Sequence, residues 1–156
     1  MLEALQATPW ATRIAESDLL FPTIETVHVL ALAVVIGSIS IVDLRLLGRS
    51  SHRGVMELSE EVLPWTWIAF VVTVISGCLM FSSAAVKYAY MVQFQVKMLL
   101  ILLAGINMLL FHFLTYRSVA KWNHDSITPP SARFAGLLSL VFWISVVTLG
   151  RWVGFV

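Results

Sequence analysis

The sequence has few charged residues and almost no cysteine. Of its 156 residues, 12% are charged and 59% are hydrophobic, and this charged share is about half of that in an ordinary soluble domain. Cys78 is the single cysteine, which excludes an internal disulfide and any cysteine-based zinc or iron-sulfur site within one chain. The formal net charge of +1 identifies no partner, and we expect no nucleic-acid binding. The composition indicates an integral membrane protein.

Four apolar runs are long enough to cross the hydrocarbon core of a bilayer, which takes about 20 residues. They cover residues 19–47, 63–86, 91–116 and 134–153. The first run has neither a basic preceding region nor an Ala-x-Ala cleavage site, which indicates a permanent span. Because short links favour antiparallel neighbours, the sequence predicts an all-α, up-down four-helix bundle that forms one membrane domain over residues 1–156.

The basic residues predict how the bundle is oriented. They gather in and beside the first and third loops, as Arg45, Arg49, Arg53, Arg117, Lys121 and Arg133. The positive-inside rule then places both termini on the outer face, which is the periplasmic side of a bacterial inner membrane. Thr8 as N-cap and Pro9 at the first helical position predict a short helix over residues 9–18 that lies in the outer interface.

Ionisable residues interrupt the outer halves of three spans. Glu25 and His28 are three residues apart and share a helical face, and Lys97 and Arg151 lie at a similar depth. Each intramembrane charge costs at least about 2.5–3.5 kcal/mol, so these groups are expected to face the bundle interior and meet partners there. A competing explanation is an ion-pair network that only orients the helices, with the two cationic side chains reaching to the interface.

The histidines within the spans suggest haem. His28 and His112 are about 15–20 Å apart along the membrane normal, whereas the two axial ligands of one iron are only about 4 Å apart. The two residues could therefore ligate two haem b groups, one per leaflet, that conduct electrons across the membrane. Candidate second ligands are His52 or His124 for the inner haem and Met80, Met98 or Lys97 for the outer haem, unless a neighbouring subunit supplies the ligand or the position stays open.

Cationic residues suit the two propionates of a haem, which need Arg or Lys partners when they are out of water. Lys97 and Arg151 are so placed on the outer side. Candidates for the same role on the inner side are Arg45, Arg49 and Arg117, where ordinary anchoring at the membrane surface is the competing explanation.

Two other functions remain open. His28, Met80, Met98 and Cys78 are ligands of the kind that select Cu(I), so the chain could bind or handle copper, alone or together with haem. It could also be a non-catalytic assembly subunit whose charges are structural. Gly150 and Gly154 form a small-x-x-x-small pattern that favours a homo-oligomer, in which a neighbour could complete the outer site.

Several segments carry a resemblance to known families. "FPTIETVH", "SIVDLRLLG", "QVKMLLILLAGIN" and "SLVFWISVVTLGRWVGF" resemble a family of small, largely uncharacterised bacterial four-helix membrane proteins. The resemblance rests on Glu25, His28, Asp43, Arg45, Lys97, Asn107, Gly150 and Arg151. The pair Lys97 and Asn107 is similar to the membrane domain of copper-resistance protein D, itself reminiscent of four-helix cytochromes of the b561 group.

The resemblance implies haem or copper at the histidines. The haem interpretation predicts membrane electron transfer or oxidoreductase activity, with a quinol or a redox protein as partner. The b561 pattern supplies two histidine ligands per haem from the spans, whereas this chain has two histidines in its spans altogether.

Overall fold

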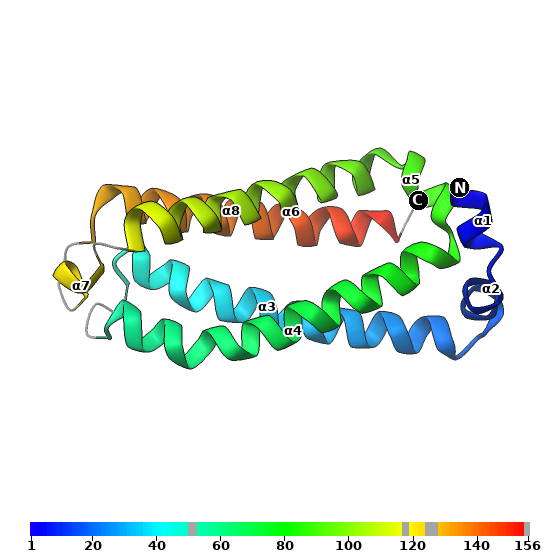
Figure 1. Cartoon of the computed structure of the whole chain (residues 1–156), viewed down its shortest axis with the longest axis horizontal. Helices are drawn as coiled ribbons and strands as arrows, with labels where there is room; N and C mark the ends of the chain where they lie inside the picture. The colour runs from blue at the N-terminus through cyan, green and yellow to red at the C-terminus, as the bar shows by residue number, and fades with distance from the viewer. Residues whose placement is uncertain (50–52, 117–118, 124–127, 155–156) are drawn as a thin grey trace.

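A computed structural model describes residues 1–49, 53–116, 119–123 and 128–154 of the chain. Four of its helices are long and apolar enough to cross a membrane. They are α3 (Leu20–Leu46), α4 (Val55–Ser83), α6 (Val92–Leu110) and α8 (Pro130–Val153), and α6 continues into a π-helix, η1 (Phe111–Thr115). The predicted all-α four-helix membrane fold is confirmed (Figure 1).

Two of the long helices begin earlier than the apolar runs. Helix α4 begins at Val55 instead of residue 63, with Gly54 as N-cap and Glu57 in the first turn. Helix α8 begins at Pro130 instead of residue 134, and proline suits that position because the first helical residues need no intrahelical donor. Apolar residues mark where a helix enters lipid, but a helix can continue into the polar interface beyond that point.

Short helices occupy the connections. Helix α5 (Ala85–Tyr90) lies in the link between the second and third spans, and α7 (Val119–Trp122) lies between η1 and α8. The predicted interfacial helix corresponds to α2 (Pro9–Glu16), and α1 (Leu2–Gln6) precedes it without having been predicted. Thr8 holds the N-cap position of α2, but its hydroxyl donates to the Leu5 carbonyl oxygen at 2.7 Å instead of capping the helix.

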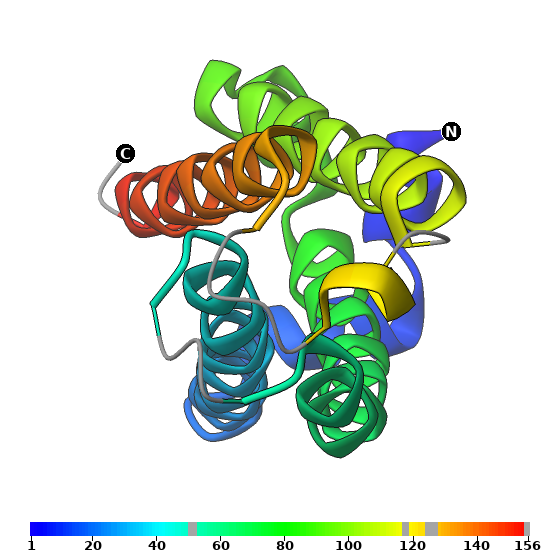
Figure 2. The same ribbon diagram turned by 90° about the vertical axis from the view of Figure 1, so that its left-hand side faces the viewer.

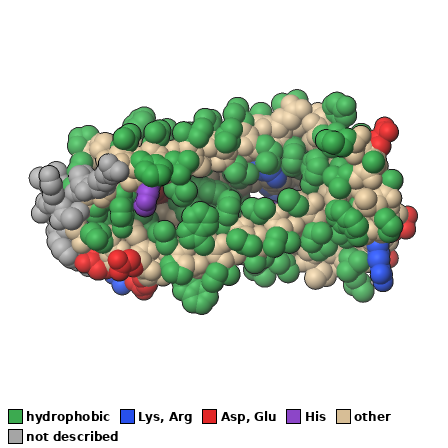
Figure 3. Space-filling view, in the orientation of Figure 1, with side chains coloured by type: hydrophobic (Ala, Val, Ile, Leu, Met, Phe, Trp, Pro, Cys, Tyr) green, Lys and Arg blue, Asp and Glu red, His purple; other side chains and the backbone are tan. Residues whose placement is uncertain are grey.

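The long helices form two pairs. Helix α3 packs along α4, α6 packs along α8, and α3 also contacts α8. Helices α4 and α6, both described over their full length, have no comparable packing, so the bundle has an open seam between them. Figure 2 shows the pairs end-on, and Figure 3 shows a hollow between them that exposes a histidine and, nearer the middle, basic side chains.

The two ends of the bundle differ. Helices α1, α2 and α5 gather at the end that also carries both chain termini, which we call the terminal end (Figure 1). Helix α7 lies at the opposite end, which we call the loop end. The buried apolar cluster lies at the loop end and consists of Leu46, Val55, Val119, Trp122 and Ala132.

The outside of the bundle is apolar. In the most apolar stretch of each long helix, only 6% to 22% of the residues are buried inside the chain. Leu30, Ile68, Leu102 and Ile144 are each at least 60% exposed. Such a continuous apolar surface needs lipid around it, so this is a multi-pass membrane protein.

Candidate metal or cofactor site

His28 is held by a hydrogen bond between the two helices of one pair. It lies half-buried on α3, and its Nδ1 is 2.9 Å from Oγ of Ser76 on α4. The Ser76 hydroxyl also lies 2.7 Å from the Val72 carbonyl oxygen, and when it donates its hydrogen there it accepts from the Nδ1–H of His28. In that tautomer the proton of the neutral ring is on Nδ1 and the lone pair is on Nε2, an atom through which an imidazole can ligate a metal.

Gly77 makes room for the imidazole ring. A Cβ at this position would lie 3.2 Å from Cε1 and 3.6 Å from Nδ1 of His28. The ring therefore lies directly against the backbone of α4, where any larger residue would crowd it. Sequence alone did not separate this role of Gly77 from ordinary helix packing.

We expect Gly77→Ala to displace the imidazole and weaken its hydrogen bond to Ser76. Gly37→Ala is the matched control, because a Cβ at Gly37 on α3 would meet nothing within 4 Å. Relative to that control, Gly77→Ala should lower the free energy of unfolding by about 1 kcal/mol, the usual value of one hydrogen bond. Denaturant unfolding in detergent micelles measures this difference, and equal stability of the two variants would contradict the contact.

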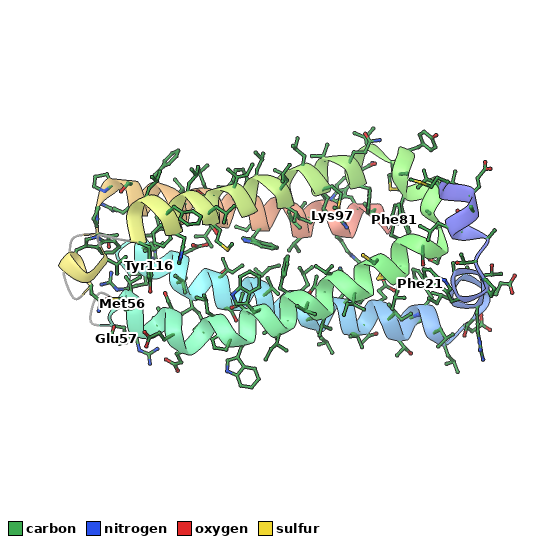
Figure 4. The ribbon with its side chains drawn as sticks, viewed as in Figure 1. Phe21, Met56, Glu57, Phe81, Lys97 and Tyr116 are labelled. Carbon is green, nitrogen blue, oxygen red and sulfur yellow. The ribbon has the colours of Figure 1, made fainter. Side chains whose placement is uncertain are left out.

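Lys97 crosses from α6 toward α8 and ends over an aromatic ring. Its Cδ lies 3.9 Å from where a Cβ on Gly150 would be, and its Nζ is 5.2 Å from the centre of the Phe94 ring. Phe94 stacks on Phe81 of α4 and on Tyr88 of α5, with ring centres 5.3 Å and 6.1 Å apart. We call Phe81, Tyr88 and Phe94 the aromatic layer; it joins α4 to α6 at the terminal end, where Figure 4 shows Lys97 beside Phe81.

Glu25 lies within electrostatic range of two other groups of the site. Its carboxylate acts on His28, as does the ammonium of Lys97, and it also acts on Tyr88. Burial, and then the negative charge of Glu25, raise the pKa of Tyr88, so the phenol stays protonated at neutral pH and can donate a hydrogen bond. The structure thus brings Glu25, His28 and Lys97 to the terminal end, but the Glu25 side chain is exposed instead of enclosed in the bundle interior as predicted.

The remaining candidates at this end differ in their placement. Met80 is partly buried three residues after Gly77, on the helical face that meets His28. Met98 is 48% exposed and follows Lys97, so it points about 100° away around α6. The side chains of Arg151 and Cys78 are exposed. Across the described ranges, no three His, Cys, Asp or Glu side chains gather closely enough to hold a metal ion.

His112 belongs to a different part of the molecule. It lies in η1 toward the loop end, is exposed, and stacks on Tyr116 with ring centres 5.4 Å apart and planes 18° apart. The structure does not bring it to His28, which agrees with the predicted separation. His52 and His124, the candidate second ligands for this end, lie outside the described residues.

Arg45 has a structural role that sequence reasoning missed. Its side chain is 1% exposed, and it donates to the carbonyl oxygens of Arg53 at 2.6 Å and Asn123 at 3.0 Å, and to Oγ1 of Thr128 at 3.4 Å. If Arg45 anchored the helix at the membrane surface, its guanidinium would lie in water. If it paired with a haem propionate, its guanidinium would point toward the ligand. Here it joins the segments that flank α4 and α7.

Comparison with known proteins gives a family without an assigned activity. No curated protein and no solved structure matches the chain. One family model matches residues 19–156, which include all the candidate site residues and leave out only α1 and α2. The chain therefore belongs to the family of unknown function DUF6644.

Proposed function

We propose that this protein is a b-type cytochrome of the membrane, in which His28 ligates the iron of a haem at the terminal end. The observation that carries the proposal is the hydrogen bond from Nδ1 of His28 to Ser76. Axial histidines in metalloproteins commonly donate the other ring N–H in this way, which fixes the tautomer and the direction of the ring.

The charges around His28 support a haem. Lys97 lies within electrostatic range of the imidazole, and Arg151 follows Gly150, the residue that the Lys97 side chain approaches. Both cations could pair with the propionates, and the carboxylate of Glu25 also lies within electrostatic range of the His28 ring. Bound haem iron would supply one-electron exchange, and the residues of this chain would orient it and exclude water.

The open seam also supports the proposal. A flat macrocycle needs space between helices, and α4 and α6 pack together only weakly while the aromatic layer joins them at one end. The hollow in Figure 3 lies between the two helix pairs. Lipid-soluble electron donors such as a quinol could approach along this seam.

The proposal includes a second haem at the loop end, ligated by His112. The exposed imidazole of this residue stacks on Tyr116, which packs against the buried cluster of that end. Two haems at opposite ends would carry electrons across the membrane. We further propose that the terminal end faces the periplasm of a bacterial inner membrane, that the protein forms a homo-oligomer, and that a quinol or a redox protein is its partner.

Copper handling is the second candidate function. Met80 lies on the face of α4 that meets His28, so the thioether and the Nε2 atom could share one Cu(I). Exposed Cys78 lies between Gly77 and Leu79 on the same helix but at a different angle around it. This proposal requires a third ligand from outside the described residues or from another molecule.

The test is a dithionite-reduced minus oxidised visible spectrum of the full chain purified in detergent, together with its iron and copper content. We expect a sharp α-band and stoichiometric iron. A colourless protein with bound copper would replace the haem proposal with the copper proposal. A colourless protein without metal, obtained from cells supplied with haem and copper, would overturn both.

A further inference from the structure

Asp43 is the most deeply buried carboxylate among the described residues. It lies on α3 near the loop end, its side chain is 5% exposed, and its Oδ2 has no hydrogen-bond partner in the described part of the chain. The Ser139 hydroxyl of α8 is the side chain that hydrogen-bonds the carboxyl group. This arrangement leaves one carboxyl oxygen enclosed by protein and unsatisfied.

The contact between α3 and α8 excludes water from this position. Gly136 of α8 lies against Asp43, and a Cβ at Gly136 would be 3.1 Å from the backbone oxygen of Asp43 and 3.1 Å from Cβ of Leu46. Leu46 belongs to the buried apolar cluster of the loop end. The carboxyl group is therefore enclosed between two closely packed backbones and an apolar cluster.

The charged groups that the structure describes on the surrounding elements contact other atoms. On α3, Arg45 donates to the carbonyl oxygens of the neighbouring loops, and on α4, Glu57 accepts from Nδ2 of Asn123. The other charged or titratable side chains that the structure describes at this end are exposed or half-buried; they are Arg49, Arg53, Glu60, Glu61, His112, Tyr116 and Arg133. Within the described part of the chain, desolvation and a hydrogen bond from Ser139 act on the Asp43 carboxyl.

An ionised carboxylate in such a place loses its hydration and gains little in return, at a cost of several kcal/mol. Adding one proton removes the charge and turns the unsatisfied oxygen into a donor. We propose that Asp43 is a proton-binding site, neutral in the conformation described here, that exchanges its proton with water at the loop end when the α3–α8 contact opens. The reaction is the transfer of one proton between water and the carboxylate, with no change of oxidation state.

The proton site does not require haem or copper to be bound. If the protein does carry electrons, the site adds proton uptake and release to that function. A membrane protein that moves electrons must balance charge, and a proton site enclosed near one membrane face can do so. The same site would serve equally in a protein that carries no cofactor. Its test therefore uses a readout of the carboxyl group itself.

The experiment is infrared spectroscopy of the full chain in lipid vesicles, titrated with acid and base in H2O and in D2O. We expect an infrared band at neutral pH from the C=O stretch of a protonated carboxyl group. The frequency of this band should shift in D2O, its intensity should fall as the pH is raised, and the band should be absent in Asp43→Asn. Glu60→Gln, which removes an exposed carboxylate of α4, should leave this band unchanged. Absence of a band that depends on Asp43 would overturn the proposal.

Two further outcomes also overturn it. A band that keeps its full intensity at every pH at which the protein stays folded would make Asp43 a permanent structural donor. A band that disappears on adding sodium or potassium at constant pH would make the site a cation site.

Gly136→Ala supplies a second variant that does not alter the carboxyl group. The new methyl group must separate α3 from α8, because the nearest atom on α3 is the rigid backbone oxygen of Asp43. We expect the band to exchange in D2O about tenfold faster than in the unaltered chain, since local opening limits exchange of enclosed protons. Gly105→Ala, whose Cβ meets nothing within 4 Å, is the control, and equal exchange rates in both variants would contradict the enclosed site.

Discussion

Replacing Arg45 with methionine is expected to lower the free energy of unfolding by about 3–5 kcal/mol, the usual cost of breaking a buried charged network. Methionine matches the length of the side chain but has no donors. The carbonyl oxygens of Arg53 and Asn123 and the hydroxyl of Thr128 would lose their hydrogen bonds to the guanidinium. Each hydrogen bond to a charged group contributes about 1.5–3 kcal/mol, which agrees with a loss of this size.

Unfolding by denaturant in detergent micelles measures the effect, with Arg49→Met as the matched control. Arg49 is exposed in the turn that follows the same helix, so its replacement should change stability by no more than about 0.5 kcal/mol. Arg45→Lys should fall between the two, because an ammonium keeps the charge but cannot reproduce the planar fork of donors. If Arg45→Met were as stable as Arg49→Met, the network at the loop end would not stabilise the fold.

Replacing His28 with alanine is expected to abolish the reduced-minus-oxidised α-band of the terminal-end haem. If the chain binds two haems, the total α-band should fall by about half, because each imidazole ligates its own iron. Pyridine haemochrome quantification of the purified protein measures the haem content directly. Because α3 and α4 are packed along their length, loss of one hydrogen bond should leave the bundle folded.

Two further variants separate ligation from positioning. His112→Ala should remove the other half of the α-band and leave the terminal-end haem intact. Ser76→Ala removes the acceptor of the Nδ1–H, so we expect haem to bind about 10–100-fold more weakly, as when such partners are lost in metal sites. A full α-band in His28→Ala would exclude this residue as a haem ligand, whatever the result for His112.

The site shows how far single-sequence reasoning extends. Residue spacing predicts that Glu25 and His28 share one helical face and that Lys97 lies at the same end of the bundle, because helical periodicity and depth follow directly from residue counting. The same counting placed His112 at the other end. The partner of His28 was not predictable, because Ser76 lies on another helix and its type is common in membrane spans.

The sequence by itself determined the four spans, the all-α class and the distribution of polar residues between the two ends. Those features depend on local hydropathy and on the rise of an α-helix, which need no knowledge of neighbours. The tertiary structure alone decided that Gly77 accommodates His28, that Gly136 encloses Asp43, and that Arg45 is buried rather than anchored in water. Each of these depends on how α3 rests against α4 and α8, and contacts between helices distant in sequence leave no periodic signal in the chain.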